Sequence, residues 1–225
     1  MKKVILALSI ILFHCKNKDS TNILMKTEIG TITIELLPNQ APITVKNFLR
    51  YIDEDRYSDF TFYRVVNMKN QNSDSVKIEV IQGGLGFNQH PDVLPPISHE
   101  STNKTDLKHL NGTISMARNE PGTASSEIFI CINDQPELDY NGSRNPDGLG
   151  FAAFGMVKSG MDIVKKIQQS PSDGQMLNKP IRVKSIKRIR TLTIITETSN
   201  SNQLYFFGME NQTGMPNMIV IMIVL

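Results

Sequence analysis

GTISMARNEPGTASSEIFICINDQPELDYNGSRNPDGLGFAAFG, residues 112–155, is the stretch of the sequence that decides the fold. It holds two short apolar runs, ISMA (114–117) and IFICI (128–132), and a segment rich in Pro, Gly, Ser and Thr separates them. A turn-rich passage then leads into FAAFG (151–155). Apolar runs bounded by such breakers predict short buried strands that are joined by loops.

Further signatures lie outside this stretch, and all of them follow in a definite order. FYRVV (62–66) precedes QGG (82–84), and S-M-A, T-x-x-S-E-x-F-I, L-D and F-G come after them. With these signatures the chain resembles the cyclophilin family of peptidyl-prolyl isomerases, and it is most similar to the cyclophilins of the bacterial envelope. The resemblance covers Thr27 to about Ile189. It is specific because six separated signatures occur in order, whereas QGG alone would indicate little.

Hydrophobic periodicity predicts the helices and strands that precede and follow residues 112–155. TITIEL (31–36) alternates between apolar and polar residues, as in a half-buried strand. Residues 39–54 have the spacing of an amphipathic helix with proline in its first turn, and residues 157–170 predict a second helix. KPIRVKSIKRI (179–189) alternates as a closing strand. The resemblance implies a mainly β fold, a closed eight-stranded antiparallel barrel capped by two α-helices. Side chains fill such a barrel, so the ligand groove is expected on its outer surface.

The resemblance also implies a site that isomerises X-Pro bonds. Amide resonance opposes this rotation by about 18 to 20 kcal/mol. An arginine aimed at the proline nitrogen would weaken the resonance, and apolar walls would exclude water. Arg64 matches the family's catalytic arginine, Gln82 matches the glutamine that contacts the substrate backbone, and Phe129 matches the floor of the proline pocket. The other implied substrate-binding positions are Val80, Met116, Ala117, Arg118, Glu127, Leu138 and Phe151. The chemistry requires no metal or other cofactor.

Three of the site positions depart from the family's usual pattern. Glu127 stands where glutamine is usual, and Phe151 replaces a histidine or tyrosine near the pocket rim. Glu137 precedes Leu138 where cyclosporin-sensitive members carry tryptophan. Loss of that indole implies low sensitivity to cyclosporin.

The region before QGG departs further. Glu79 falls where the family has an aromatic pocket residue, which would make one pocket wall polar and reduce activity. Ile78 is the alternative wall, because an insertion leaves the register open by a residue or two. The polar insertion, residues 67–78, predicts a surface hairpin beside the site.

The N-terminus predicts an exported protein. Residues 1–15 combine two lysines with an apolar run of about ten residues, too short to span a bilayer, as in a secretory signal. Cys15 lies where a lipoprotein signal places its acylated cysteine, so a lipid anchor is expected; the alternative is an ordinary signal cleaved elsewhere. We expect a linker over 16–25, a cyclophilin-like domain over 26–190, and a C-terminal tail of unknown role over 191–225.

Composition excludes other classes of function. With 24 basic and 22 acidic residues, the charge gives no case for binding nucleic acid. Cys131 lies in an apolar run without a pairing partner, which predicts a buried, inert thiol. The irregular spacing of His90, His99 and His109 in a proline-rich passage predicts solvent-exposed loop histidines rather than metal ligands.

The sequence therefore supports one leading hypothesis and two rivals. We expect a monomeric, lipid-anchored peptidyl-prolyl isomerase of the bacterial cell envelope or periplasm, which helps exported, proline-containing polypeptides to fold. A weakly active or inactive module that binds proline segments or a partner is the alternative, favoured by Glu79, Glu127 and the insertion. A surface adhesin is a third hypothesis that rests only on the predicted anchor.

Overall fold

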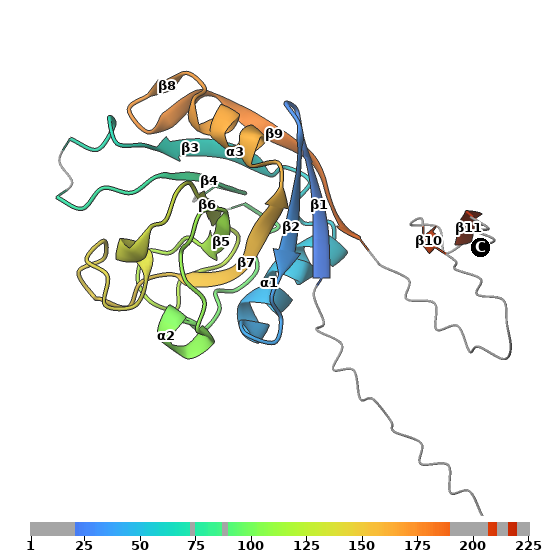
Figure 1. Cartoon of the computed structure of the whole chain (residues 1–225), viewed down its shortest axis with the longest axis horizontal. Helices are drawn as coiled ribbons and strands as arrows, with labels where there is room; N and C mark the ends of the chain where they lie inside the picture. Colours follow the sequence, from blue (N-terminus) through green and yellow to red (C-terminus); the bar gives the residue numbers. More distant parts are fainter. Residues whose placement is uncertain (1–20, 73–74, 87–89, 190–206, 211–215, 220–225) are drawn as a thin grey trace, which may run out of the picture.

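The computed structural model describes residues 21–72, 75–86, 90–189, 207–210 and 216–219 (Figure 1). The predicted signal peptide, including Cys15, lies outside the described residues. Most of the predicted tail also lies outside them, except for β10 (Phe207–Glu210) and β11 (Pro216–Ile219), which form a separate antiparallel pair.

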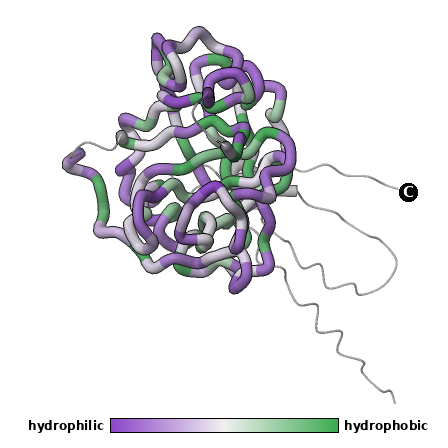
Figure 2. Tube along the Cα trace, turned by 90° about the vertical axis from the view of Figure 1, so that its left-hand side faces the viewer, coloured by the Kyte–Doolittle hydropathy of each residue, from purple (hydrophilic) through white to green (hydrophobic). Residues whose placement is uncertain are grey.

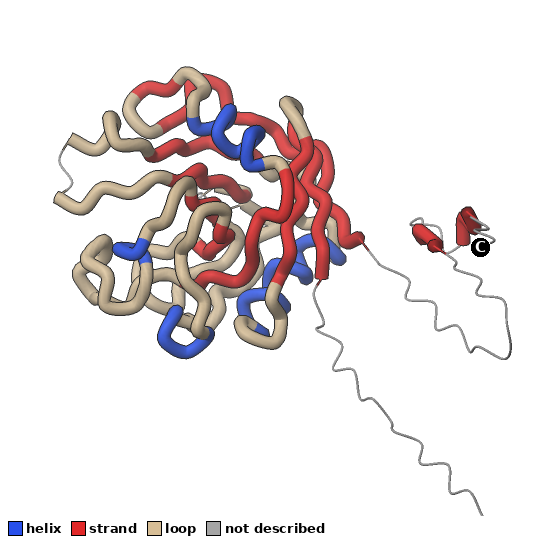
Figure 3. Tube along the Cα trace, viewed as in Figure 1, coloured by secondary structure: helices blue, strands red, loops and turns tan. Residues whose placement is uncertain are grey.

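The main body is a closed antiparallel β-barrel (Figures 1 and 3). Around the barrel the order is β1 (Thr21–Thr27), β2 (Thr31–Leu36), β7 (Ala152–Ser159), β5 (Thr113–Met116), β6 (Ile128–Cys131), β4 (Val80–Gly84), β3 (Thr61–Val66) and β9 (Met176–Ile189). β9 pairs with β1 and closes the ring, so that the expected eight-stranded barrel is confirmed. The short strand β8 (Ser172–Asp173) only forms a tight hairpin with the start of β9.

Alternate side chains of each strand point inward and fill the interior of the barrel. In β2, Ile32, Ile34 and Leu36 are fully buried and belong to one large hydrophobic cluster inside the barrel. Phe62 and Phe154 come from opposite parts of the sheet and are also fully buried in this cluster. Figure 2 shows the hydrophobic stretches running through the body and hydrophilic stretches along its margins. Buried side chains therefore fill the barrel, as expected from the sequence.

The two predicted helices are present, but residues 157–159, expected to belong to the second helix, form the end of β7. α1 (Pro42–Asp53) begins with proline, and Val45, Phe48 and Tyr51 are buried on its inner face. α3 (Met161–Gln168) buries its apolar stripe against the barrel from another side. Two shorter elements were not predicted: α2 (Thr102–Thr105) and a 3₁₀ turn (Pro136–Leu138). Among the described residues, no helix combines the length and apolar character needed to cross a bilayer.

The start of the barrel differs from the expected boundary at residue 26. Residues 21–25, expected to belong to a linker, form most of β1 and pair with both β2 and β9. Ile23 and Met25 are completely buried in the core, because alternate residues of a strand point to the same face of the sheet. This alternation is short, and its continuation toward β2 is interrupted by the turn in which Thr27 N–H donates to the Gly30 carbonyl.

Candidate active site

A β-bulge in β3 turns two consecutive side chains to the outside of the barrel. Phe62 pairs with Gly83 and Arg64 pairs with Gln82, so Tyr63 is the extra residue between them. Phe62 is buried in the core, whereas Tyr63 and Arg64 are partly exposed and bond to outward side chains. Bulges commonly re-aim side chains beside functional sites. The bulge therefore places Arg64 on the outer surface.

Two glutamine side chains hold the guanidinium of Arg64. Its Nη1 donates to Oε1 of Gln82 at 2.7 Å. Its Nε and Nη2 both donate to Oε1 of Gln175, at 3.0 and 2.5 Å. Gln175 lies in the turn between β8 and β9, and its backbone carbonyl accepts from Val65 N–H at 2.8 Å. Sequence reasoning missed Gln175, because it lies 111 positions from Arg64 and no signature marks it.

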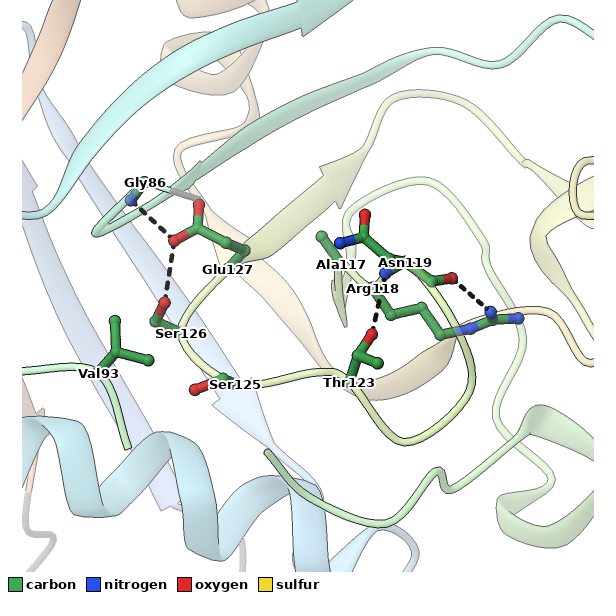
Figure 4. Close-up of a pocket in the computed structure, with 9 residues that line it drawn as sticks. All are labelled: Gly86, Val93, Ala117, Arg118, Asn119, Thr123, Ser125, Ser126 and Glu127. Atoms are coloured by element: carbon green, nitrogen blue, oxygen red, sulfur yellow. Dashed lines mark hydrogen bonds between the residues drawn. The ribbon is translucent and has the colours of Figure 1, made fainter. Parts of the chain in front are cut away.

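A second line of hydrogen bonds continues from Gln82 to a buried carboxylate. Nε2 of Gln82 donates to the Tyr63 hydroxyl at 3.0 Å, and that hydroxyl donates to Oε2 of Glu127 at 2.5 Å. Oε1 of Glu127 accepts from Gly86 N–H at 2.9 Å and from the Ser126 hydroxyl at 3.0 Å (Figure 4). Burial, and then the Glu127 carboxylate, raises the pKa of Tyr63 far above its usual value, so the hydroxyl remains a donor.

Gly84 makes room for this carboxylate. A β-carbon built on Gly84 would lie 2.3 Å from Oε1 of Glu127, closer than any real contact. The second glycine of the QGG signature thus has a packing role next to the site, since a side chain here would displace Glu127.

A second hydrophobic cluster lies beside Arg64, on the outside of the barrel core. Its members are buried residues from β3, β4, β6 and the loops that flank them: Val66, Ile78, Val80, Ala117, Phe129, Cys131 and Leu138. The ring of Phe151, which is partly exposed, packs edge-on against the ring of Phe129 with their centroids 5.2 Å apart. Because Gln82 pairs with Phe129 across β4 and β6, this cluster and the Arg64 network share one face. We call the cluster, including Phe151, the outer apolar pocket.

Glu79 is not a wall of this pocket. Its carboxylate accepts from Nδ2 of Asn133 at 2.8 Å in an exposed position, whereas Ile78 and Val80 on either side are buried in the outer apolar pocket. Period-two alternation turns Glu79 away from its neighbours. The interpretation of Glu79 as a polar wall is wrong, and Ile78 and Val80 supply the apolar surface.

The structure does not bring Met116 to the outer apolar pocket, and it places the charge of Arg118 at the edge of that pocket, over Phe151. Met116 is buried with the barrel core. The Arg118 side chain is almost fully buried, and it donates to the Gly150 carbonyl at 2.7 and 2.9 Å and to the Asp147 carboxylate at 2.8 and 3.0 Å. The same guanidinium lies 5.2 Å from the ring centre of Phe151. Arg118 therefore holds the loop that carries Phe151.

His109 is buried behind the pocket, which corrects the expectation of an exposed loop histidine. Its Nδ1 lies 2.8 Å from Oδ1 of Asp139, and its Nε2 lies 2.9 Å from the Ser115 hydroxyl. Its ring stacks on Phe129, with the two centroids 5.8 Å apart. His109 thus supports the pocket floor, and nothing in the spacing of the histidines indicates this.

The other two histidines lie nearer the surface. His99 is partly buried and bonds to the Leu149 carbonyl, and burial lowers its pKa.

Cys131 is buried in β6 as predicted, and burial raises the pKa of its thiol. Over the part of the chain that the structure describes, no group of three His, Cys, Asp or Glu residues could hold a metal ion.

The predicted insertion, residues 67–78, forms a loop rather than a hairpin over the residues that are described. Gln71 is buried, and its amide bonds to the carbonyls of Asn67 and Ile78 at 2.7 Å each. Asn70 donates to the carbonyls of Val65 and Gly174 at 3.0 Å. The insertion therefore packs beside Arg64 against the β8–β9 turn.

A small pocket opens next to Glu127. Its volume is about 190 Å³. Figure 4 shows its lining, which consists of Gly86, Val93, Ala117, Arg118, Asn119, Thr123, Ser125, Ser126 and Glu127. Ala117 also belongs to the outer apolar pocket, so this small pocket adjoins that cluster.

Comparison with known proteins places this architecture in one family. The model of the cyclophilin type peptidyl-prolyl cis-trans isomerase/CLD family matches residues 22–188. Peptidyl-prolyl cis-trans isomerase A of Dickeya dadantii is 34% identical over 180 residues, which are 76% of this chain and 86% of the relative. A peptidyl-prolyl cis-trans isomerase of Acinetobacter baylyi is 34% identical over 193 residues, which are 84% of this chain and 94% of the relative.

Solved structures agree on the fold. A cyclophilin type peptidyl-prolyl cis-trans isomerase of Cryptosporidium parvum superimposes with a TM-score of 0.58 at 23% identity, and the match covers 75% of this chain and 97% of that one. The family model covers most of the chain, and both relatives exceed 30% identity over more than two thirds of it. The chain therefore belongs to the cyclophilin-type peptidyl-prolyl cis-trans isomerase family.

Proposed function

We propose that the protein catalyses cis-trans isomerisation of X-Pro bonds at the outer apolar pocket, with Arg64 as the catalytic residue. One observation carries this proposal: a guanidinium fixed by Gln82 and Gln175 lies on the same face as a buried apolar cluster with Phe129 at its centre. The relatives named above carry this activity in their names.

The proposed mechanism needs only positioning and a donor. The proline ring would seat on Phe129 between Val80, Ala117 and Leu138, where little water competes for hydrogen bonds. A guanidinium N–H aimed at the proline nitrogen stabilises its pyramidal form, which exists only in the twisted transition state. Gln82 would contact the substrate backbone while it holds Arg64. The absence of Glu79 from the pocket removes the main argument for a weakly active binding module.

The first experiment measures cis-to-trans rates of a short proline peptide with purified protein and with the Arg64→Ala variant. We expect the variant to lose about 10²- to 10³-fold in kcat/KM, as for removal of one transition-state donor. Arg182→Ala, which changes an exposed arginine of β9, is the matched control and should keep full activity. A folded wild-type protein that gives no acceleration would leave a proline-binding module instead.

We also propose that the protein acts as a monomer on exported polypeptides, anchored to the bacterial envelope through acylated Cys15. The charged start, short apolar run and cysteine at the polar boundary support this. Growth with radiolabelled palmitate should label the wild-type protein in the membrane fraction but not the Cys15→Ser variant. Equal labelling of both proteins would place the acylation at a residue other than Cys15. Absence of label from both, with both released into the soluble fraction, would argue for an ordinary cleaved signal.

A further inference from the structure

Glu127 and Tyr63 are linked to Arg64 by one continuous line of side-chain hydrogen bonds. The line runs from Glu127 through the Tyr63 hydroxyl and the Gln82 amide to Nη1 of Arg64, with steps of 2.5, 3.0 and 2.7 Å. Glu127 is 5% exposed and Gln82 is 3% exposed, so water competes little with these bonds. The proposed mechanism uses only the last two members of the line.

The chemistry of the two ends fixes the direction of every bond between them. Arginine can only donate, and a carboxylate can only accept. Glu127 already accepts from the backbone N–H of Gly86, which is also a pure donor. The Tyr63 hydroxyl therefore donates to Glu127 and accepts from Gln82, which leaves the amide oxygen of Gln82 facing Arg64.

The reversed orientation of the Gln82 side-chain amide would break its hydrogen bond with Arg64. An amide carries a donor and an acceptor of nearly equal shape, so either can face a neighbour. If the amide were reversed, its NH₂ group would face the guanidinium, and two donors would meet without an acceptor. Arg64 would then lose the partner on its Nη1 side, and only Gln175 among the contacts described above would still hold it.

We propose that Glu127 and Tyr63 are positioning residues, which fix the orientation of Gln82 and through it the plane of Arg64. This inference deepens the proposed function and rests on it, because it assigns the residues that aim the catalytic guanidinium. Such aiming matters because a donor stabilises a transition state only when it is already oriented.

The Glu127→Gln variant tests the donor and acceptor roles along this line of hydrogen bonds. The new amide can keep an oxygen toward Gly86 N–H while it offers an N–H to Tyr63, which allows the whole line to reverse. Tyr63→Phe cuts the line instead. We expect each variant to lose roughly tenfold in kcat/KM on a proline peptide, the usual worth of one hydrogen bond, with the loss in kcat rather than in KM.

A double-mutant cycle separates this role from a merely structural one. In a Gln82→Ala background the line is already cut, so Tyr63→Phe and Glu127→Gln should cause no further loss of kcat/KM. Matched controls are Tyr57→Phe, which removes a buried hydrogen bond to the Ser126 carbonyl, and Glu79→Gln, which changes an exposed carboxylate. Both should keep kcat/KM, although Tyr57→Phe should lower the melting temperature.

A spectroscopic measurement decides the inference independently of catalysis. In ¹⁵N-resolved NMR spectra we expect Glu127→Gln to shift the side-chain amide resonances of Gln82 and to speed solvent exchange of the Arg64 Nη1 protons, which bond to Gln82. If both signals stay as in the wild type, the inference is overturned, even in a protein without isomerase activity. If Arg64→Ala abolishes activity while Tyr63→Phe and Glu127→Gln retain it in full, the inference fails and the proposed function stands.

Discussion

Gln175 accepts two hydrogen bonds from Arg64 with a single oxygen, across 111 positions of sequence. Its own amide nitrogen donates to the carbonyl of Asn70 in the insertion, at 3.2 Å. Its oxygen is thereby turned toward the guanidinium, since the nitrogen already has an acceptor. The insertion, predicted from the sequence to lie beside the site, thus helps to hold Arg64 through Gln175.

Gln175→Ala should weaken catalysis without unfolding the protein. A hydrogen bond to a charged group is worth about 1.5 to 3 kcal/mol, so we expect kcat/KM to fall by roughly ten- to hundredfold. Stopped-flow rates on a proline peptide measure this loss. Gln169→Ala, which changes an exposed glutamine after α3, is the matched control. Equal rates for both variants would show that Gln175 is not needed to orient Arg64.

Val80 and Glu79 are adjacent, but substitutions at the two positions should affect the KM differently. Val80→Asp places an unpaired carboxylate in the outer apolar pocket, where it also opposes a proline ring. We expect the KM for a proline peptide to rise at least about tenfold, since burying one unpaired polar group costs about 1 to 3 kcal/mol. Glu79→Ala should leave KM unchanged. A rise in KM with Glu79→Ala would return Glu79 to the pocket wall.

His109→Ala should destabilise the protein and loosen the pocket floor. The substitution removes a buried ring and the hydrogen bonds that its two nitrogens make to Asp139 and Ser115, and it takes away the surface on which Phe129 stacks. We expect the free energy of unfolding to fall by about 2 to 4 kcal/mol, measured by urea denaturation monitored by circular dichroism. An unchanged midpoint would contradict the supporting role described for this residue.

The loop that carries Phe151 should loosen in acid. Hydrogen bonds from Arg118 hold the pKa of Asp147 below its usual value. A lowered pKa in the folded state means that the ion pair adds stability above the unfolded-state pKa, and that this stability is lost as pH falls through the lower, folded-state pKa. Asp147→Asn should therefore lower the melting temperature at pH 7 and have little effect near pH 2. The same decrease at both pH values would argue against the ion pair.

The sequence predicts the barrel and the pocket well but misses the supports of the site. Ordered local signatures identify Arg64, Gln82 and Phe129, and alternation finds the strands, because both depend on neighbours in sequence. Gln175 and His109 escape because their partners are remote, and isolated glutamines and histidines carry no pattern. Met116 and Arg118 lie within a signature yet pack inward, which only three-dimensional structure reveals.

The bulge at Tyr63 decides which face of the sheet the Arg64 side chain occupies. Strand residues alternate faces, so one extra residue shifts the phase of everything on one side of it. A deletion of Tyr63 would rotate either Arg64 or Phe62 through the sheet. Either the outward arginine or a core side chain would then be lost, although both residue types would still be present. The one-residue spacing between Phe62 and Arg64 within FxRV is therefore as informative as the arginine itself.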